Sequence, residues 1–184
     1  LEVVAVAESR RTGARRLGTF RWGLVPSWAK DPAIGSRLIN ARAESLADKP
    51  AFRNALARRR CIIPADAFYE WKRAAGPKGP KQPYVIRHRD RSPLAFAGLW
   101  EVWRPPGAGD DDPWLRTCTI VTTSANAVVA PLHDRMPVVL DENDWDRWLD
   151  PSLDQAGAVA DLLVPAPEES LETFPVSTEV NNVA

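Results

Sequence analysis

Short segments that favour β-strands recur along almost the whole chain, and this succession constrains the fold more than any other feature. The segments are rich in valine, isoleucine, threonine and aromatic residues, and turn-forming residues separate them. The first two segments are close enough in sequence to pair as a hairpin. Strands are predicted at residues 1–7, 17–24, 38–43, 61–64, 67–71, 84–87, 94–102, 117–123, 138–140 and 174–180.

Few segments favour helices. Phe52 and Leu56 lie on one face of a helix that is expected to start near residues 45–48. A short helix that begins at a capping aspartate is expected at residues 141–149, and another at residues 152–163. Many short strands with a few helices predict an α+β fold. Its β-rich core of mostly antiparallel strands is expected to curl into a barrel.

The chain length indicates one domain. A chain of 184 residues can bury a sizeable core but is too short for two typical domains. There is no internal repeat, and the 17 prolines are spread along the chain and do not mark a linker. An exposed loop is predicted at residues 27–31, a turn at 76–80 and a solvated loop at 105–113. We therefore expect a single domain over residues 1–184.

The charges are strongly segregated along the sequence, although the formal net charge is zero. Residues 1–104 carry 21 lysines and arginines and 9 acidic residues, whereas residues 105–184 carry 3 and 15. A chain of this kind can be neutral and still present a basic face to a polyanion. Alternatively, folding interleaves the two halves and their charges pair across the surface. The charge pattern alone is compatible with both.

Several classes of function lack their sequence signals. Cys61 and Cys118 are too few for a disulfide framework, and their apolar, β-like surroundings are typical of buried free thiols in a reducing cytosol. There is no metal-binding spacing, glycine-rich phosphate loop, dinucleotide fingerprint or Gly-x-Ser-x-Gly motif. No apolar run reaches the roughly 18 residues of a membrane span. We expect no cofactor, no metal and no membrane contact.

Polar side chains stand out in two of the predicted strands. Strand alternation places Leu38, Asn40 and Arg42 on one face, although asparagine is uncommon in strands. Asn40 could be functional, or it could bond to neighbouring backbone. Glu70 lies among bulky residues in Phe68–Lys72, where desolvation would raise its pKa towards the range of a general acid or base. The alternative is a glutamate at a strand edge that pairs with an arginine.

Two further places carry candidate residues. In the extended segment 131–137, His133 and Arg135 point to the same side. Segment 21–28 places Trp22 and Trp28 near basic residues, and exposed aromatic rings in a basic groove suit single-stranded nucleic acid. Because tryptophan is more often a core residue, Trp22 is expected to be buried and Trp28 to be the more exposed of the two.

Five motifs taken together resemble the SRAP family, the SOS response-associated peptidases related to the eukaryotic abasic-site shield proteins. Each motif is weak alone, but their order and spacing over nearly the whole chain are highly specific to the family. A closing segment at residues 175–181 also matches the family's pattern. The motifs are residues 21–28 (RWGLVPSW), 40–44 (NARAE), 60–64 (RCIIP), 68–71 (FYEW) and 133–137 (HDRMP).

The resemblance implies an enzyme that recognises abasic sites in single-stranded DNA and crosslinks to them as part of the DNA-damage response. In the family, an N-terminal cysteine supplies an amine and a thiol that condense with the sugar aldehyde, first to an imine and then to a thiazolidine. The family's Met-Cys-Gly-Arg opening does not occur in this sequence, so about 40 residues of the N-terminal part are expected to be missing. The resemblance also implies a monomer in the bacterial cytosol, associated with the nucleoid when DNA is damaged.

The resemblance assigns roles to six residues. Asn40 would hold the reacting N-terminus or the sugar, while Glu70 and His133 would transfer protons. Arg42 and Arg135 would grip the phosphates that flank the lesion, and Trp28 would stack near the kinked strand. Two other functions stay open: a peptidase that acts on its own N-terminus or on peptides, and a non-catalytic single-stranded DNA binder.

Overall fold

The computed structural model describes residues 1–73, 81–109 and 111–181. The turn predicted at residues 76–80, and residue 110 of the predicted loop, lie outside these ranges. The strands of the described residues are β1 (Glu2–Glu8), β2 (Arg15–Trp22), β3 (Asn40–Arg42), β4 (Arg60–Ala65), β5 (Phe68–Arg73), β6 (Lys81–His88), β7 (Leu94–Trp103), β8 (Leu115–Ser124), β9 (Arg135–Pro137) and β10 (Leu171–Pro175).

The helices are all short. Two are α-helices, α1 (Arg53–Arg58) and α2 (Trp145–Leu149). The 3-10 helices of the described part are η1 (Pro32–Arg37), η2 (Ala43–Ser45), η3 (Glu142–Asp144), η4 (Ala156–Leu162), η5 (Glu168–Ser170) and η6 (Thr178–Asn181). None of the helices in this part is both long and apolar enough to cross a membrane.

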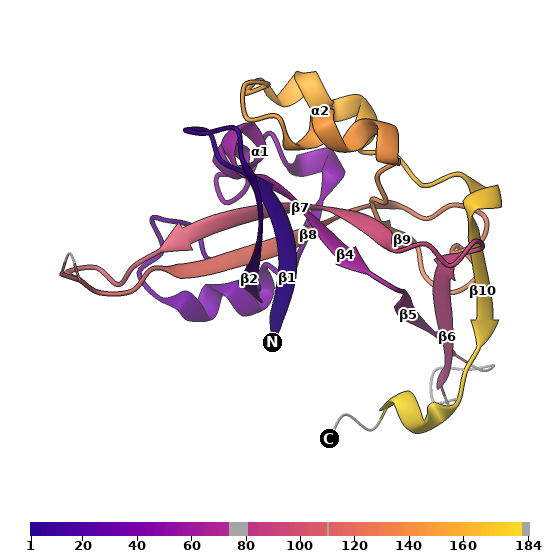
Figure 1. Cartoon of the computed structure of the whole chain (residues 1–184). Helices are drawn as coiled ribbons and strands as arrows, with labels where there is room; N and C mark the ends of the chain where they lie inside the picture. The colour runs from indigo at the N-terminus through magenta and orange to yellow at the C-terminus, as the bar shows by residue number, and fades with distance from the viewer. Residues whose placement is uncertain (74–80, 110, 182–184) are drawn as a thin grey trace.

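Five strands form a closed barrel. They follow the order β2-β1-β4-β7-β8, and β2 closes the ring by pairing in parallel with β8, Arg21 opposite Thr117 and Trp22 opposite Cys118. The other neighbours in the ring are antiparallel. Figure 1 shows this barrel at the centre of the molecule, with α1 and α2 over one side. The predicted α+β fold with a barrel-like core is therefore confirmed.

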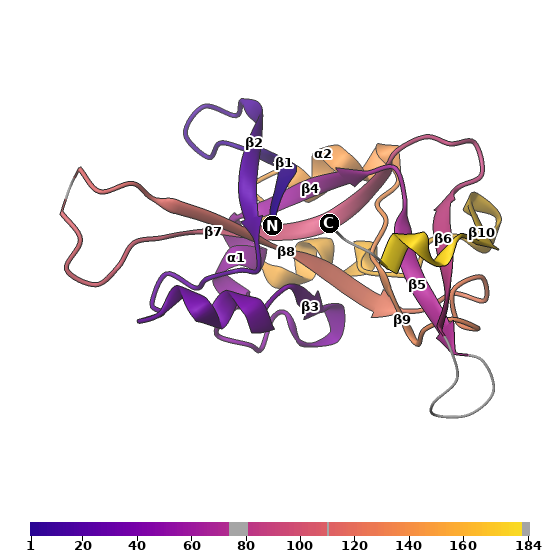
Figure 2. The same ribbon diagram turned by 90° about the horizontal axis from the view of Figure 1, so that it is seen from below.

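Short strands extend the barrel where the site forms. β3 pairs in parallel with the second half of β8, and β9 pairs with the last residues of β8 from its other side. A separate antiparallel sheet, β10-β6-β5, lies beside this end of the barrel (Figure 2). The candidate residues predicted from the sequence come from β3, β5, β9 and the segment that leads into β9.

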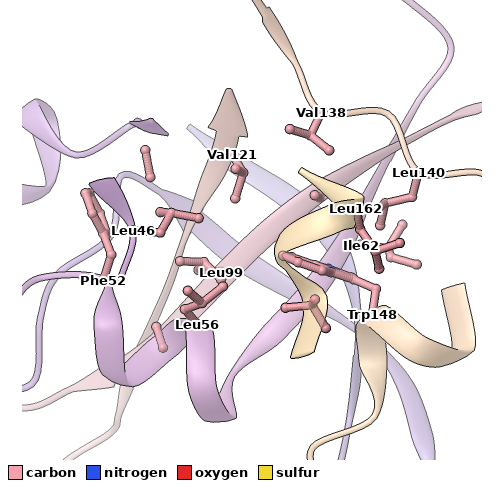
Figure 3. Packing of buried hydrophobic residues seen from close by; sticks show 14 of the residues in the cluster. Leu46, Phe52, Leu56, Ile62, Leu99, Val121, Val138, Leu140, Trp148 and Leu162 are labelled. Carbon is pink, nitrogen blue, oxygen red and sulfur yellow. The ribbon is translucent and has the colours of Figure 1, made fainter. Parts of the chain in front are cut away.

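Two main hydrophobic clusters hold these layers together. One packs α1, α2 and η4 against the outside of the barrel, where Trp148 lies beside Ile62 and Leu162 (Figure 3). The Trp148 indole N–H also donates to the carbonyl of Cys61 at 2.9 Å. The second cluster fills the barrel interior and continues under β6 and β10. Burial of this apolar area is the main force that stabilises the fold.

Most predicted elements are present. The first two strands pair as a hairpin over Glu2–Glu8 and Arg15–Trp22. Phe52 and Leu56 are both buried, 2% exposed each, although the α-helix itself begins only at Arg53. Asp141 caps η3 through a bond from the Asn143 backbone N–H, as predicted from the sequence. Both cysteines are free and buried, which confirms that expectation.

Three predicted elements are wrong in part. Residues 138–140 do not form a strand and make one isolated bridge, between Val139 and Phe96. The strand β9, which pairs with β8, ends just before them at Pro137. Of residues 152–163, only Ala156–Leu162 are helical, as the 3-10 helix η4, which has Gly157 in its first turn and no side-chain cap at its start. The last predicted strand starts earlier, as β10, and gives way to η6 at Thr178.

Candidate nucleic-acid interface

Strand β3 presents two polar side chains on one face. Its register with β8 sets Asn40 opposite Ile120 and Arg42 opposite Thr122. Ala41, between them, is 1% exposed and packs into the core outside the barrel, whereas Asn40 and Arg42 are exposed. The alternation expected from the sequence is confirmed. Within the described residues the Arg42 guanidinium makes no hydrogen bond and no ion pair, so its donors are available to a ligand.

The position of β3 depends on the segment that precedes it. The Trp22 indole N–H donates to the carbonyl of Ile39 at 2.8 Å, directly before Asn40. Gly23 has a φ of 114°, and a Cβ there would lie 2.5 Å from the carbonyl oxygen of Gly35, so only glycine fits. Trp22 was predicted to be buried, but it is only half-buried. Its ring anchors this segment through the bond to Ile39. Trp28, in contrast, is 59% exposed, in agreement with the prediction.

His133 is held at the end of a tight turn. Its backbone N–H donates to the carbonyl of Val129, and its Nδ1 accepts from the backbone N–H of Arg135 at 2.9 Å. When Nδ1 accepts this bond, the neutral imidazole carries its proton on Nε2. Asn126 fixes the turn from below, since its side chain accepts from the N–H of Val129 and donates to the carbonyl of Ala166. Nδ1 also lies 3.1 Å from the carbonyl oxygen of Arg135, to which the other tautomer would donate, so the exposed ring is held in a defined orientation in either tautomer.

Glu70 lies close enough to His133 for their charges to interact. Burial raises the pKa of the Glu70 carboxyl above its ordinary value. A charge on His133 and a hydrogen bond from the backbone N–H of Trp71 lower the pKa of Glu70, whereas the negative charge of Asp134 raises it further. β5, which carries Glu70, lies beside β9 in Figure 2, consistent with this coupling. A half-buried carboxyl of raised pKa beside an exposed imidazole is an arrangement that suits proton transfer.

Arg135 is already paired in this structure. Its terminal nitrogens donate to both carboxylate oxygens of Glu44, at 2.7 and 2.9 Å, and to the carbonyl of Thr122 at 2.6 Å. The hydrogen bonds from Arg135 hold the pKa of Glu44 below its ordinary value, and the charge of Arg42 lowers it further. To bind a phosphate with these nitrogens, Arg135 would first have to break its bonds to Glu44. Arg42 has no such bond to break.

The sequence interpretation missed Glu44 as a site residue. It lies within the 40–44 motif, two residues after Arg42, and its partner Arg135 lies in the 133–137 motif. The two residues are 91 positions apart, so only the occurrence of both in family motifs could have suggested the pair. Glu44 links η2 to β9 and so fixes β3 relative to the turn that carries His133.

The structure thus brings five of the six predicted residues to one end of the barrel. Asn40 and Arg42 come from β3, His133 and Arg135 from the turn into β9, and Glu70 from β5. Trp28 lies in the loop between β2 and η1, which is anchored elsewhere by a bond from the Trp103 indole to the carbonyl of Ala29. No group of three or more potential metal ligands occurs among the described residues. The arrangement can bind anions, hold a polar sugar and transfer protons.

Comparisons with known proteins agree with this arrangement. The profile of the family described as "SOS response associated peptidase (SRAP)" matches residues 2–183. The chain is 47% identical over 167 residues to the abasic site processing protein YoqW of Bacillus subtilis, covering 91% of this chain and 72% of that protein. It is 34% identical over 201 residues to the abasic site processing protein HMCES of Gallus gallus, covering 97% of this chain and 57% of that protein.

A solved structure has the same fold. The crystal structure of a protein from Bacteroides thetaiotaomicron superposes with a TM-score of 0.86 at 26% identity, covering all of this chain and 77% of that one. Because the family profile matches this chain over residues 2–183, the chain belongs to the SRAP family.

Proposed function

We propose that this chain, as one SRAP-like domain over residues 1–184, binds abasic sites in single-stranded DNA and assists their covalent capture. The observation that carries the proposal is the pairing of a half-buried carboxyl of raised pKa, Glu70, with the exposed imidazole of His133. The exposed Asn40 and Arg42 lie on a strand of the same barrel end. The names of the relatives YoqW and HMCES support the choice of an abasic site as substrate.

The chemistry begins with opening of the sugar ring. An abasic deoxyribose is a cyclic hemiacetal, so the ring opens when a proton leaves the C1′ hydroxyl and another reaches the ring oxygen. A protonated Glu70 would donate to the ring oxygen, while His133, in the tautomer whose Nδ1–H donates to the Arg135 carbonyl, would accept from the hydroxyl at Nε2. The raised pKa of Glu70 keeps a larger protonated fraction near neutrality than an ordinary glutamate has. The product is an aldehyde at C1′.

Capture of the aldehyde needs an amine and a thiol. The amine adds to C1′, loss of water gives an imine, and the thiol then adds to the imine carbon to close a thiazolidine. In the family these groups belong to an N-terminal cysteine. Cys61 and Cys118 carry no free α-amine, and burial raises the pKa of the Cys118 thiol to about 12 and that of Cys61 well above its ordinary value. We therefore assign neither of them as the nucleophile.

The DNA strand would be held by contacts around this pair. Arg42 would bind a flanking phosphate with free donors, and Arg135 would bind one in exchange for Glu44. Trp28 offers an exposed ring for an unstacked base. Asn40 would hydrogen-bond to the sugar or to the reacting amine. We further propose that the protein acts as a monomer in the cytosol, associated with the nucleoid when DNA is damaged.

Capture by free cysteine tests the proposal on this chain. Cysteine supplied in solution condenses with an abasic oligonucleotide, and the thiazolidine is counted by its added mass. The chain is expected to accelerate this reaction on a single strand, and replacement of Glu70 or His133 by Gln or Ala is expected to remove most of the acceleration. Binding of the abasic strand without acceleration would favour a non-catalytic DNA binder. Cleavage of added peptides without DNA binding would favour a peptidase.

A further inference from the structure

A second concave surface lies at the other end of the barrel from Asn40 and His133. It is a cavity of about 1120 Å³ between the tip of the β1–β2 hairpin, α1 and the adjoining ends of β7 and β8. Arg116, at the start of β8, lines it, whereas β3 pairs with β8 from Ile120 onward. We refer to this cavity as the arginine basin. Its arginines are Arg10, Arg11, Arg16, Arg58, Arg59 and Arg116.

The positive charge of the basin is largely uncompensated. Its lining includes two acidic residues, Glu8 and Asp154, and Glu8 already pairs with Arg15 at 3.1 Å. Five of the six arginines are exposed, and their guanidinium groups make no hydrogen bond or ion pair with any described residue. The exception is Arg59, whose guanidinium pairs with Glu101. Several free guanidinium groups around one cavity favour a ligand that carries phosphate.

The interior of the basin is aromatic rather than polar. Phe20 and Trp100 meet edge to face with ring centroids 5.9 Å apart, and the Arg59 guanidinium lies 5.7 Å from the Trp100 ring. The indole nitrogen of Trp100 is buried and has no hydrogen-bond partner among the described residues. Gly18 adds no side chain, which leaves space beside Phe20. Aromatic rings and a stacked guanidinium are the groups on which nucleobases stack.

We propose that the arginine basin is a nucleotide-binding site, separate from the Asn40–Glu70–His133 site. The base would lie against Trp100 and Arg59, with the buried Phe20 as the floor beneath Trp100, and the phosphate would be bound by Arg16 and Arg116 at the rim. The cavity is slightly larger than the roughly 300–1,000 Å³ of small-ligand sites and has room for one nucleotide. The nucleotide comes either free from solution or as one unit of a single strand.

Two kinds of variant separate charge from shape. Arg16→Ala combined with Arg116→Ala removes two phosphate donors. Gly18→Leu keeps every charge but fills the basin; a Cβ at Gly18 meets only ordinary contacts, Phe20 Cε2 at 3.5 Å and Arg116 Nη1 at 3.8 Å, so the strand tolerates it. The matched control is Arg89→Ala combined with Lys49→Ala, which removes two exposed positive charges outside the basin.

The probes are deoxyadenosine monophosphate, inorganic phosphate and a fluorescent thymidine oligonucleotide, with affinities measured by calorimetry and by anisotropy. Both basin variants are expected to weaken binding of at least one nucleotide probe about tenfold or more, while the control stays within about twofold of wild type. An effect on the monophosphate identifies free nucleotide as the ligand; an effect on the oligonucleotide alone identifies the strand.

Two results would overturn the proposal. One is an unchanged affinity of both nucleotide probes in both basin variants. The other is inorganic phosphate binding as tightly as the monophosphate, which would mean that the base contributes nothing. A His133→Ala variant is expected to retain binding in the basin, so failure of the basin proposal is distinguishable from failure of the proposed function.

Discussion

Replacing Glu70 by glutamine is the sharpest perturbation of the proposed proton-transfer pair. Glutamine keeps the shape and hydrogen-bonding reach of the side chain but cannot exchange a proton at neutral pH. General acid–base assistance is worth about 10² to 10⁴ in rate, so capture of free cysteine by the abasic strand should slow by about that factor. The affinity for the strand should stay within about twofold, because no phosphate contact is assigned to Glu70.

The same variant has a predicted effect on stability. Burial raises the pKa of Glu70 in the folded state, so its carboxylate form is less favourable there than in the unfolded chain. The contribution of a group with a raised pKa is fully present below its unfolded pKa and is lost as the pH rises through its folded pKa. Glu70→Gln should therefore melt at a higher temperature than wild type at pH 7. This advantage should disappear below about pH 4.3.

Glu172 provides a matched control in β10, which belongs to the same sheet as β5 and is separated from it by β6. Its carboxylate accepts from Arg87 at 2.8 Å, a partly exposed ion pair of the kind worth about 0–1 kcal/mol. Glu172→Gln should lower the melting temperature slightly and leave the capture rate unchanged. A Glu70→Gln rate within about threefold of wild type, together with a lower melting temperature at pH 7, would refute the reasoning. Glu70 would then be a structural residue, and His133 would act alone.

Three further predictions concern the DNA contacts. A polypeptide that begins at Leu1 should bind abasic single strands reversibly and give no denaturant-resistant band on a gel; such a band would reveal another nucleophile. Arg42→Ala should weaken single-strand binding at all sequences and reduce the salt slope by about 0.7, one phosphate contact, while Arg89→Ala should leave that slope unchanged. Trp28→Ala should cost about 1–3 kcal/mol of binding with an unchanged melting temperature, and an unaltered Kd would place its ring away from the strand.

Local patterns in the sequence predicted most of the fold and the faces of the site strands. Alternation predicted that Asn40 and Arg42 share one face, and the structure shows that this face is exposed while Ala41 is buried. Bulky neighbours of Glu70 predicted its desolvation, and the direction of its pKa agrees. The barrel followed from the number of short strands rather than from any single segment. Each of these inferences depends on residues that are close in sequence.

Contacts between distant segments could not be predicted in this way. The interaction of Glu70 with His133 and the ion pair of Arg135 with Glu44 both depend on how β3, β5 and β9 gather around the end of β8. The arginine basin brings together a hairpin, a helix and two strand ends, so the segregated charges of the sequence did not locate it. The helix predicted over residues 152–163 is shorter than expected and is the 3-10 helix η4 over Ala156–Leu162.

The most direct test of the central claim is an NMR titration of the side chains in the candidate site. Two single strands are compared, identical except that one carries an abasic site where the other carries thymidine. We expect the side-chain amide of Asn40 and the imidazole of His133 to shift more strongly with the abasic strand, whereas both strands should shift the indole of Trp28. Equal shifts with the two strands, or shifts confined to residues far from Asn40 and His133, would contradict it.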